Sequence, residues 1–145
     1  MTIEVEIDNR SGWKVDEPAV AAAMRCALAA EGVASGDVGV ILLDEEEIRQ
    51  LNEDHRGKPS ATDVLSFPMD GREPLPDGVP RQLGDVVVCP AVARAEGTPL
   101  ETLLVHGALH LLGFDHTHPG DARRMEMAES RLLHRIGVPN PWKRA

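Results

Sequence analysis

The sequence lacks the features of membrane proteins and of disulfide-bonded secreted proteins. No apolar run in its 145 residues approaches the roughly 20 residues of a membrane-spanning helix. The first segment, residues 1–8, alternates charged with β-branched residues and is unlike a signal peptide. The two cysteines, Cys26 and Cys89, have no C-x-x-C partner, so we interpret both as small buried hydrophobic residues. We therefore expect a cytoplasmic protein with no membrane partner.

Positive charge is also scarce. The chain has 15 Lys and Arg residues against 24 Asp and Glu residues, which gives a net charge of −9. An acidic surface repels nucleic acid at long range, and a phosphate-binding surface normally needs clustered basic residues. Composition alone therefore argues against a nucleic-acid partner. The exception is local, because Arg56, Lys58 and a bound metal could form one positive pocket in an acidic body.

Half of the six histidines fall in the segment from His106 to His116. His106 and His110 are four residues apart, so on a helix they project side by side, about 5–6 Å apart at Cβ. Gly113 tolerates left-handed backbone angles and would end the helix, and the turn after it would carry His116 back toward the pair. Three imidazole ligands leave a fourth position for water, which is typical of a catalytic zinc. The pattern predicts a hydrolytic site with one zinc ion per chain.

The residue after the first histidine separates this segment from the zinc proteases. The metzincin pattern H-E-x-x-H-x-x-G-x-x-H matches the histidines and the glycine, but Gly107 stands where those proteases have glutamate. That glutamate is their general base. The sequence therefore disfavours ordinary peptide hydrolysis at this site.

The length of the chain predicts a single domain over residues 1–145, and the sequence shows neither an internal repeat nor a domain boundary. The expected order of elements is β-α-β-α-β-β-α-α, which predicts an α+β fold with helices packed on a small mixed sheet. Residues 69–82 have no periodicity and are expected to form a mobile loop at the rim of the site. The predicted strands are 3–7, 38–43, 64–67 and 83–88. Three helices are predicted to follow caps at Asp16, Asp44 and Thr98, and a fourth to run from about Asp121 to Arg135.

The histidine segment resembles the signature of the YbeY family, bacterial metal-dependent endoribonucleases implicated in ribosomal RNA maturation. The similar pattern is H-G-x-L-H-L-x-G-F-D-H over residues 106–116. Two further blocks resemble the family in the same order, R-G-K at 56–58 with T-D-V-L-S-F-P at 62–68, and L-G-D-V at 83–86. The resemblance implies a zincin-like α+β fold, with a four-stranded sheet and a metal-binding helix.

The resemblance also implies an activity, that of a single-strand-specific endoribonuclease. It would act in the late processing of the 3′ end of small-subunit ribosomal RNA and in ribosome quality control. Ribosomal RNA is then the expected partner, with ribosomal subunit proteins as further partners, and DNA is not expected. Zinc is the expected cofactor, held by His106, His110 and His116.

Two further residues are candidates for catalysis. Arg56 would neutralise charge on the scissile phosphate, and its alternative role is that of a cation at a helix C-terminus. Asp115 would orient a ligand histidine or accept a proton, and its alternative role is to cap the turn after Gly113. The general base stays open between metal hydroxide, Asp115 and the 2′-OH of the substrate.

Two rival functions stay open as well. The metal could serve hydrolysis of another bond, such as an amide. Alternatively, the chain could be a ribosome-assembly factor whose zinc only stabilises the turn before His116. A structural zinc normally has a fourth protein ligand, so His118 or a carboxylate at the ion would favour this second rival.

Overall fold

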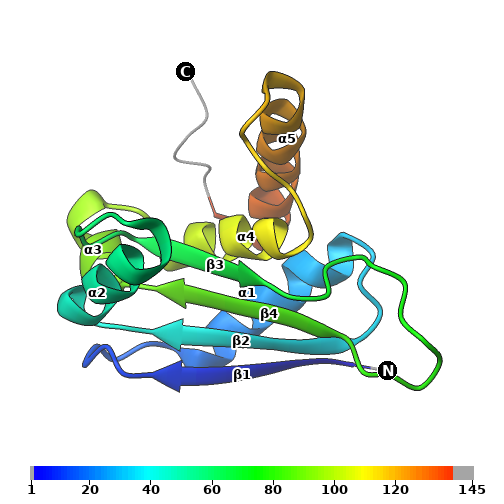
Figure 1. The fold of residues 1–145 in the computed structure, drawn as a ribbon, viewed down its shortest axis with the longest axis horizontal. Helices are drawn as coiled ribbons and strands as arrows, with labels where there is room; N and C mark the ends of the chain where they lie inside the picture. The colour runs from blue at the N-terminus through cyan, green and yellow to red at the C-terminus, as the bar shows by residue number, and fades with distance from the viewer. Residues whose placement is uncertain (1, 139–145) are drawn as a thin grey trace.

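The structure, a computed structural model, describes residues 2–138 of the chain. Within this range it has a single sheet of four strands and five helices (Figure 1). The fold is therefore α+β, as the sequence predicts. The strands are β1 (Ile3–Asn9), β2 (Gly36–Leu42), β3 (Val64–Pro68) and β4 (Gln82–Val88), and the helices are α1 (Glu17–Ala30), α2 (Glu45–Arg56), α3 (Pro90–Glu96), α4 (Leu100–Leu111) and α5 (Pro119–Ile136).

The sheet is mixed, with the strand order β1-β2-β4-β3. The pairs β1–β2 and β2–β4 are parallel, and Val40 lies between Ile7 on one side and Val86 on the other. At the edge, β3 runs antiparallel to β4 and places Ser66 beside Val86. The four-stranded mixed sheet implied by the resemblance is thereby confirmed.

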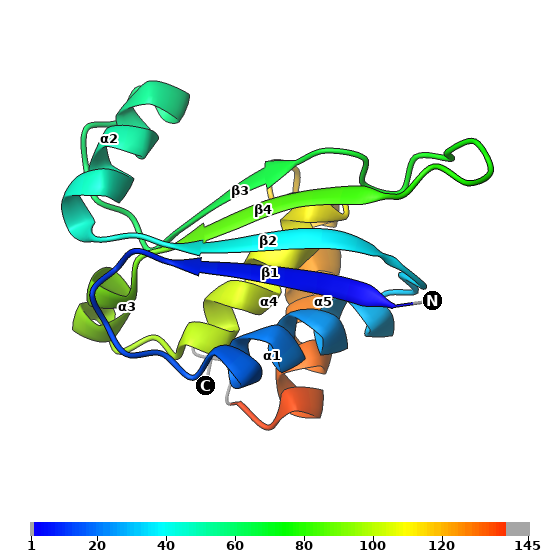
Figure 2. The ribbon, with the colours of Figure 1, turned by 90° about the horizontal axis from the view of Figure 1, so that it is seen from below.

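Helices cover the two faces of the sheet unequally (Figure 2). On one side, α1, α4 and α5 form the main core with inward-facing residues of the sheet such as Val40 and Val86. On the other side, α2 covers a smaller core that includes Ile48 and Leu65. α4 contacts α1, α5, β3 and β4, and eight of its twelve residues are buried. Packing on several sides therefore fixes the position of α4.

The first two helices begin where the sequence predicts. The Asp16 carboxylate accepts a hydrogen bond from the backbone N–H of Ala19 at 3.1 Å, and that of Asp44 accepts one from Glu47 at 2.8 Å. Each bond satisfies a backbone donor that has no partner inside the helix. α2 ends at Gly57, whose φ of 70° is a left-handed conformation that suits glycine.

The C-terminal half differs from the expected elements at the starts of its helices. α3 is a helix in addition to the predicted elements. It begins at Pro90, shortly after the predicted strand 83–88, and proline is favourable in the first turn of a helix. Thr98 does not cap α4; Pro99 holds the cap position without a side-chain hydrogen bond. The predicted last helix is confirmed as α5, which begins at Pro119, slightly before the expected start at about Asp121. In each case a proline starts the helix or directly precedes it.

The segment between β3 and β4 extends beyond the end of the sheet (Figure 2). The guanidinium of Arg81 donates to the carbonyl oxygens of Gly71 at 2.7 Å and Glu73 at 2.8 Å, which ties the loop to its own base.

Both cysteines are free thiols, Cys89 buried and Cys26 half-buried. None of the helices found in residues 2–138 is long and apolar enough to cross a membrane.

Candidate metal centre

α4 places two of the predicted ligands on the same face. His106 and His110 are one turn apart, and both are half-buried on a helix whose other residues are mostly buried. Their imidazole rings lie edge to face with centroids 4.6 Å apart, and their Nε2 atoms are 3.0 Å apart. The expectation that these side chains converge is therefore confirmed as geometry.

The end of α4 brings the third histidine to the pair. Gly113 has φ 93°, its N–H donates to the His110 carbonyl at 3.1 Å, and the N–H of Phe114 donates to the Leu109 carbonyl at 3.0 Å. These two bonds form a Schellman motif, which ends the helix and turns the chain back. The ring of His116 then lies 5.2 Å from that of His110 and 5.9 Å from that of His106, centroid to centroid.

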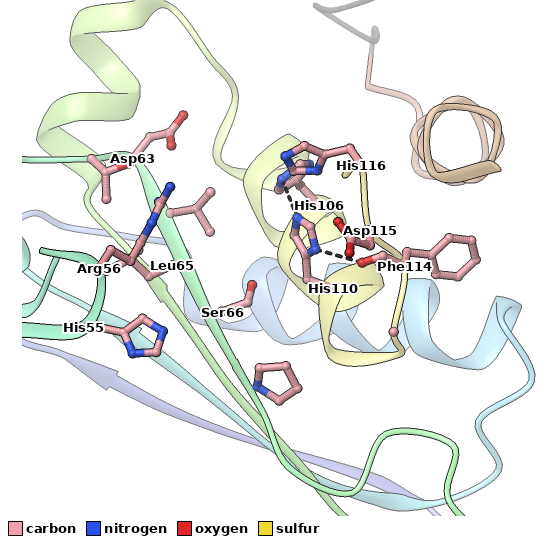
Figure 3. A pocket seen from close by; sticks show the side chains of 14 residues that line it. His55, Arg56, Asp63, Leu65, Ser66, His106, His110, Phe114, Asp115 and His116 are labelled. Carbon is pink, nitrogen blue, oxygen red and sulfur yellow. Dashed lines mark hydrogen bonds between the residues drawn. The ribbon is translucent and has the colours of Figure 1, made fainter. Parts of the chain in front are cut away.

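The three histidines form one group, with one ring nitrogen from each lying within 4.8 Å of the others (Figure 3). The group that the described residues form has three members and includes neither His118 nor a carboxylate. His118 is instead the exposed residue that precedes α5. Three protein ligands around one point match a catalytic zinc site better than a closed structural one.

Hydrogen bonds at the far side of two rings aim their Nε2 atoms at this point. The Nδ1 of His106 lies 2.5 Å from Oε1 of Glu129, and the Nδ1 of His110 lies 2.9 Å from the carbonyl oxygen of Phe114. Because a carboxylate and a carbonyl accept, Nδ1 is the protonated nitrogen of each ring in its neutral form, and Nε2 of that form keeps its lone pair. This is the tautomer that a metal ligand needs when it binds through Nε2.

The donor set fits a tetrahedral ion. Ligands at about 2.0–2.1 Å from a tetrahedral zinc are about 3.3 Å from one another, close to the 3.0 Å between the two Nε2 atoms. Burial lowers the pKa of His110, and the neighbouring His106 and His116 lower it further. A lowered pKa favours the neutral imidazole, which is the form that binds metal.

A cavity of about 620 Å³ lies beside the three histidines and reaches the end of α2. Arg56 and His55 line it opposite the histidines, and Ser66 of β3 lies between the two groups (Figure 3). The structure thus brings Arg56 and the histidine group to one cavity, although they are far apart in sequence. Lys58 is exposed and does not line this cavity, and neither does any residue of the predicted loop 69–82.

Asp115 lines the same cavity, but its hydrogen bonds belong to the turn. One carboxylate oxygen accepts bonds from the backbone N–H of Thr117 at 2.9 Å and from the Thr117 hydroxyl. These bonds hold the pKa of Asp115 below its ordinary value, which makes its carboxylate a weaker base. Of the roles considered for Asp115, the geometry favours the turn cap.

Gly107 explains in physical terms why the protease glutamate is absent. It is buried where α4 meets the sheet, and a Cβ built on it would lie 2.5 Å from Cγ1 of Val86. Any side chain at this position would force the helix away from β4. The Ser66 hydroxyl donates to the Gly107 carbonyl at 3.4 Å on the same side of the helix. The position next to His106 thus serves packing rather than proton transfer.

The sequence analysis missed Glu129. Its side chain is 7 % exposed, and its carboxylate contacts a ring nitrogen of His106 across the interface of α4 and α5. The signal was present in the sequence, because Glu129 falls in the apolar stripe of α5 that Met125 and Leu132 define. A glutamate in such a stripe is buried and therefore needs a partner.

Comparison with known proteins places the chain in a family. The family model described as "Endoribonuclease YbeY" matches residues 6–137. Curated proteins of that name are 48 % identical in Halorhodospira halophila over 74 % of this chain and 75 % of the relative, and 39 % identical in Alcanivorax borkumensis over 99 % of this chain and 87 % of the relative.

The fold has a counterpart among solved structures. The solution structure of TM1509 from Thermotoga maritima superposes with a TM-score of 0.54 at 24 % identity, and the match covers 97 % of this chain and 99 % of that one. This likeness supports the fold alone. The family match and the curated relatives carry the assignment, and the chain belongs to the Endoribonuclease YbeY family.

Proposed function

We propose that this protein is a zinc-dependent endoribonuclease that cuts single-stranded RNA at the His106–His110–His116 group. Membership of the Endoribonuclease YbeY family supports the reaction class. The observation that carries the proposal is a three-histidine group with room for a fourth ligand, in one cavity with an arginine. A phosphodiester substrate needs both a metal and a cation at the phosphate.

Each residue of the cavity has a role in this proposal. A zinc ion held by the three histidines would supply a Lewis acid that lowers the pKa of water and polarises a phosphoryl oxygen. Arg56 would hold the phosphate through two parallel N–H bonds and stabilise the charge that develops in the transition state. Glu129 would keep His106 in its ligand tautomer, and Asp115 would hold the turn that presents His116.

Zinc is the proposed metal because the donor set is made of neutral imidazoles. Imidazole suits zinc, and neither a thiolate nor a carboxylate joins this group among the described residues. Within residues 2–138 no fourth side chain joins the three histidines, which speaks against a purely structural zinc. The packing at Gly107 speaks against amide hydrolysis of the protease type, because no glutamate fits there.

Ribosomal RNA is the proposed substrate and ribosomal subunit proteins are proposed partners, with the cytoplasm as the location. These three statements rest on the resemblance to the YbeY family and on the cytoplasmic expectation from composition. The acidic net charge of −9 does not contradict them, because Arg56 and the metal would provide positive charge where the phosphate lies.

A cleavage assay on the purified, zinc-loaded protein tests the proposal. Single-stranded RNA labelled at either end should give labelled fragments of intermediate length, which report internal cuts, and a fully paired duplex of the same sequence should resist. The absence of RNA cleavage by protein that carries one zinc per chain would overturn the proposal. Shortening from the ends alone would overturn the endonucleolytic part of it.

A further inference from the structure

His55 occupies a place in the cavity that the proposed reaction does not use. It lies in the last turn of α2, directly before Arg56, and it is exposed. Its side chain lines the same cavity as the histidine group, and it lies beside Arg56 on the opposite wall (Figure 3). It is too far from the group to be counted among its members. A ligand that spans from the metal to Arg56 would therefore reach this ring.

Phe67 supports the His55 ring. The centroids of the two rings are 4.5 Å apart with the ring planes tilted by 51°. Phe67 is half-buried on β3, packs against the smaller core under α2, and does not itself line the cavity. The imidazole is thus backed by a fixed aromatic side chain while it remains exposed on the cavity side. Two χ angles suffice to define such a ring, so little entropy is lost when a ligand stacks on it.

The net charge of the molecule favours a contact with RNA that does not depend on charge. A nucleic-acid-binding protein usually gains affinity from many phosphate contacts, but this chain carries a net charge of −9. Of the two cations that the sequence placed near the phosphate, Arg56 lines the cavity and Lys58 does not. Stacking of a base on a ring does not depend on net charge and is tolerant of base identity.

We propose that His55, backed by Phe67, is a stacking platform for one unpaired nucleobase of the RNA next to the phosphate that Arg56 holds. A base inside a duplex has both faces covered by its neighbours and cannot stack on a side chain. The platform therefore gives a physical reason for preferring single-stranded RNA. This inference rests on the proposed endoribonuclease function, and it names the part of the substrate that the second wall of the cavity recognises.

Binding to short labelled RNA tests the platform without interference from cleavage. Oligoadenylate and oligouridylate with phosphorothioate linkages, which keep the backbone charge and resist hydrolysis, are titrated into zinc-loaded protein by fluorescence anisotropy. His55→Ala should weaken binding of oligoadenylate by about 5- to 20-fold, toward the lower end of measured stacking contributions, and that of oligouridylate by less, because purines stack better. His55→Phe should preserve affinity, whereas His55→Gln, which keeps a polar side chain without a ring, should behave like His55→Ala. His134→Ala, at an exposed site on α5 away from the cavity, is the matched control.

A set of RNAs with one abasic site each distinguishes stacking from a merely structural role. With the parental protein, one abasic position should lower affinity, and with His55→Ala the same position should have no further effect.

The salt dependence of binding distinguishes the contribution of His55 from that of its neighbour Arg56. Arg56→Ala should reduce the slope of log affinity against log salt by about one, whereas His55→Ala should leave the slope unchanged.

Several results would overturn the platform. The platform is overturned if His55→Ala binds RNA as tightly as the parental protein, or if His55→Gln and His55→Phe change affinity equally. It is also overturned if His55→Ala loses as much affinity for RNA that is abasic at every position as it loses for intact RNA. Failure of the platform is distinguishable from failure of the proposed function. If zinc-loaded His55→Ala cleaves RNA with parental KM and kcat, the endoribonuclease stands and the platform falls; if the parental protein cuts no RNA, the proposed function falls.

Discussion

The two walls of the cavity are built in opposite ways. On one wall, His106 and His110 project from a largely buried helix, and hydrogen bonds to Glu129 and Phe114 fix the orientation of their rings. On the other wall, Arg56 is exposed at the end of α2, and within residues 2–138 its side chain has no hydrogen bond or ion pair. The first wall is complete without a ligand, whereas the second has donors that still lack an acceptor.

This difference indicates a division of labour. The side chains of the α4 wall are held in place before an ion binds, by the packing of α4 and by buried hydrogen bonds. We propose that RNA orders the α2 wall, because the Arg56 guanidinium has no partner within residues 2–138 and can turn fully to a phosphate. Substitutions on the α4 wall should therefore change metal binding and stability. Substitutions on the α2 wall should change only the binding and cleavage of RNA.

The largest expected effect is on the α4 wall. The double variant His106→Ala/His110→Ala should fall from about one zinc per chain to none and lose RNA cleavage, because one remaining imidazole cannot hold the ion. Metal content by elemental analysis checks this, with His134→Ala as control. The single variants sharpen the comparison. Metal-free His106→Ala should lose about 1–3 kcal/mol more stability than His110→Ala, because it leaves the Glu129 carboxylate buried without its partner. Full zinc retention in the double variant would show that His106 and His110 do not form the metal site.

On the α2 wall, Arg56→Ala should lower turnover by roughly 10²–10³ while zinc content and melting temperature stay parental. Arg56→Lys should also lose much of the turnover, since lysine keeps the charge but not the two parallel N–H bonds. The loss should appear in kcat more than in KM if the contact strengthens in the transition state. Parental cleavage rates in both variants, with metal bound, would leave Arg56 as a cation at the end of a helix.

Glu129→Gln should have an intermediate effect. The amide oxygen can still accept a hydrogen bond from Nδ1 of His106, so the fold should persist, but the ligand loses the negative charge behind it. Zinc affinity, measured by competition with a chelator, should fall by about 10- to 100-fold. Glu126→Gln, at an exposed position of the same helix, is the control and should bind zinc normally. If Glu129→Gln binds zinc as tightly as the parent, Glu129 serves only to join α5 to α4.

The smallest effect is expected at Asp115. Because its carboxylate holds the turn through Thr117, Asp115→Asn should keep one acceptor oxygen and change kcat by no more than a few-fold. Asp115→Ala should lower the melting temperature slightly, as the loss of a capping interaction of about 0.5–2 kcal/mol does. A loss of kcat of roughly 10² or more with Asp115→Asn at full zinc occupancy would instead identify this residue as a proton acceptor.

The local features of the site could be predicted from the sequence because their signals are local. The spacing of His106 and His110, the helix end at Gly113 and the caps at Asp16 and Asp44 all lie within a few residues of the structure they specify. Alternation of apolar residues located the first strand, and short apolar runs located the other three. Such signals depend on the geometry of one turn or one strand, which a short stretch of sequence determines.

The remaining features depend on contacts between distant segments. The strand order β1-β2-β4-β3 results from long-range pairing, and no single strand encodes it. Glu129 and His106 are in contact although they are 23 residues apart in the sequence. The need for glycine at position 107 arises from its close approach to Val86 on the sheet. α3 is short, and its first residue, Pro90, is equally compatible with the end of a strand. These were the points at which prediction from the sequence was incomplete or wrong.

The central claim is that the metal serves catalysis at a wall that folds without it. Its most direct test measures RNA cleavage and the far-UV circular dichroism of one protein sample before chelation, after chelation and after zinc is restored. We predict that chelation abolishes cleavage, leaves most of the helical signal and the cooperative thermal transition, and is reversed by zinc, because α4 is held by its buried residues. An unfolded metal-free protein together with a zinc-bound protein that cuts no RNA would contradict the claim, since the binding energy of a structural metal is folding energy.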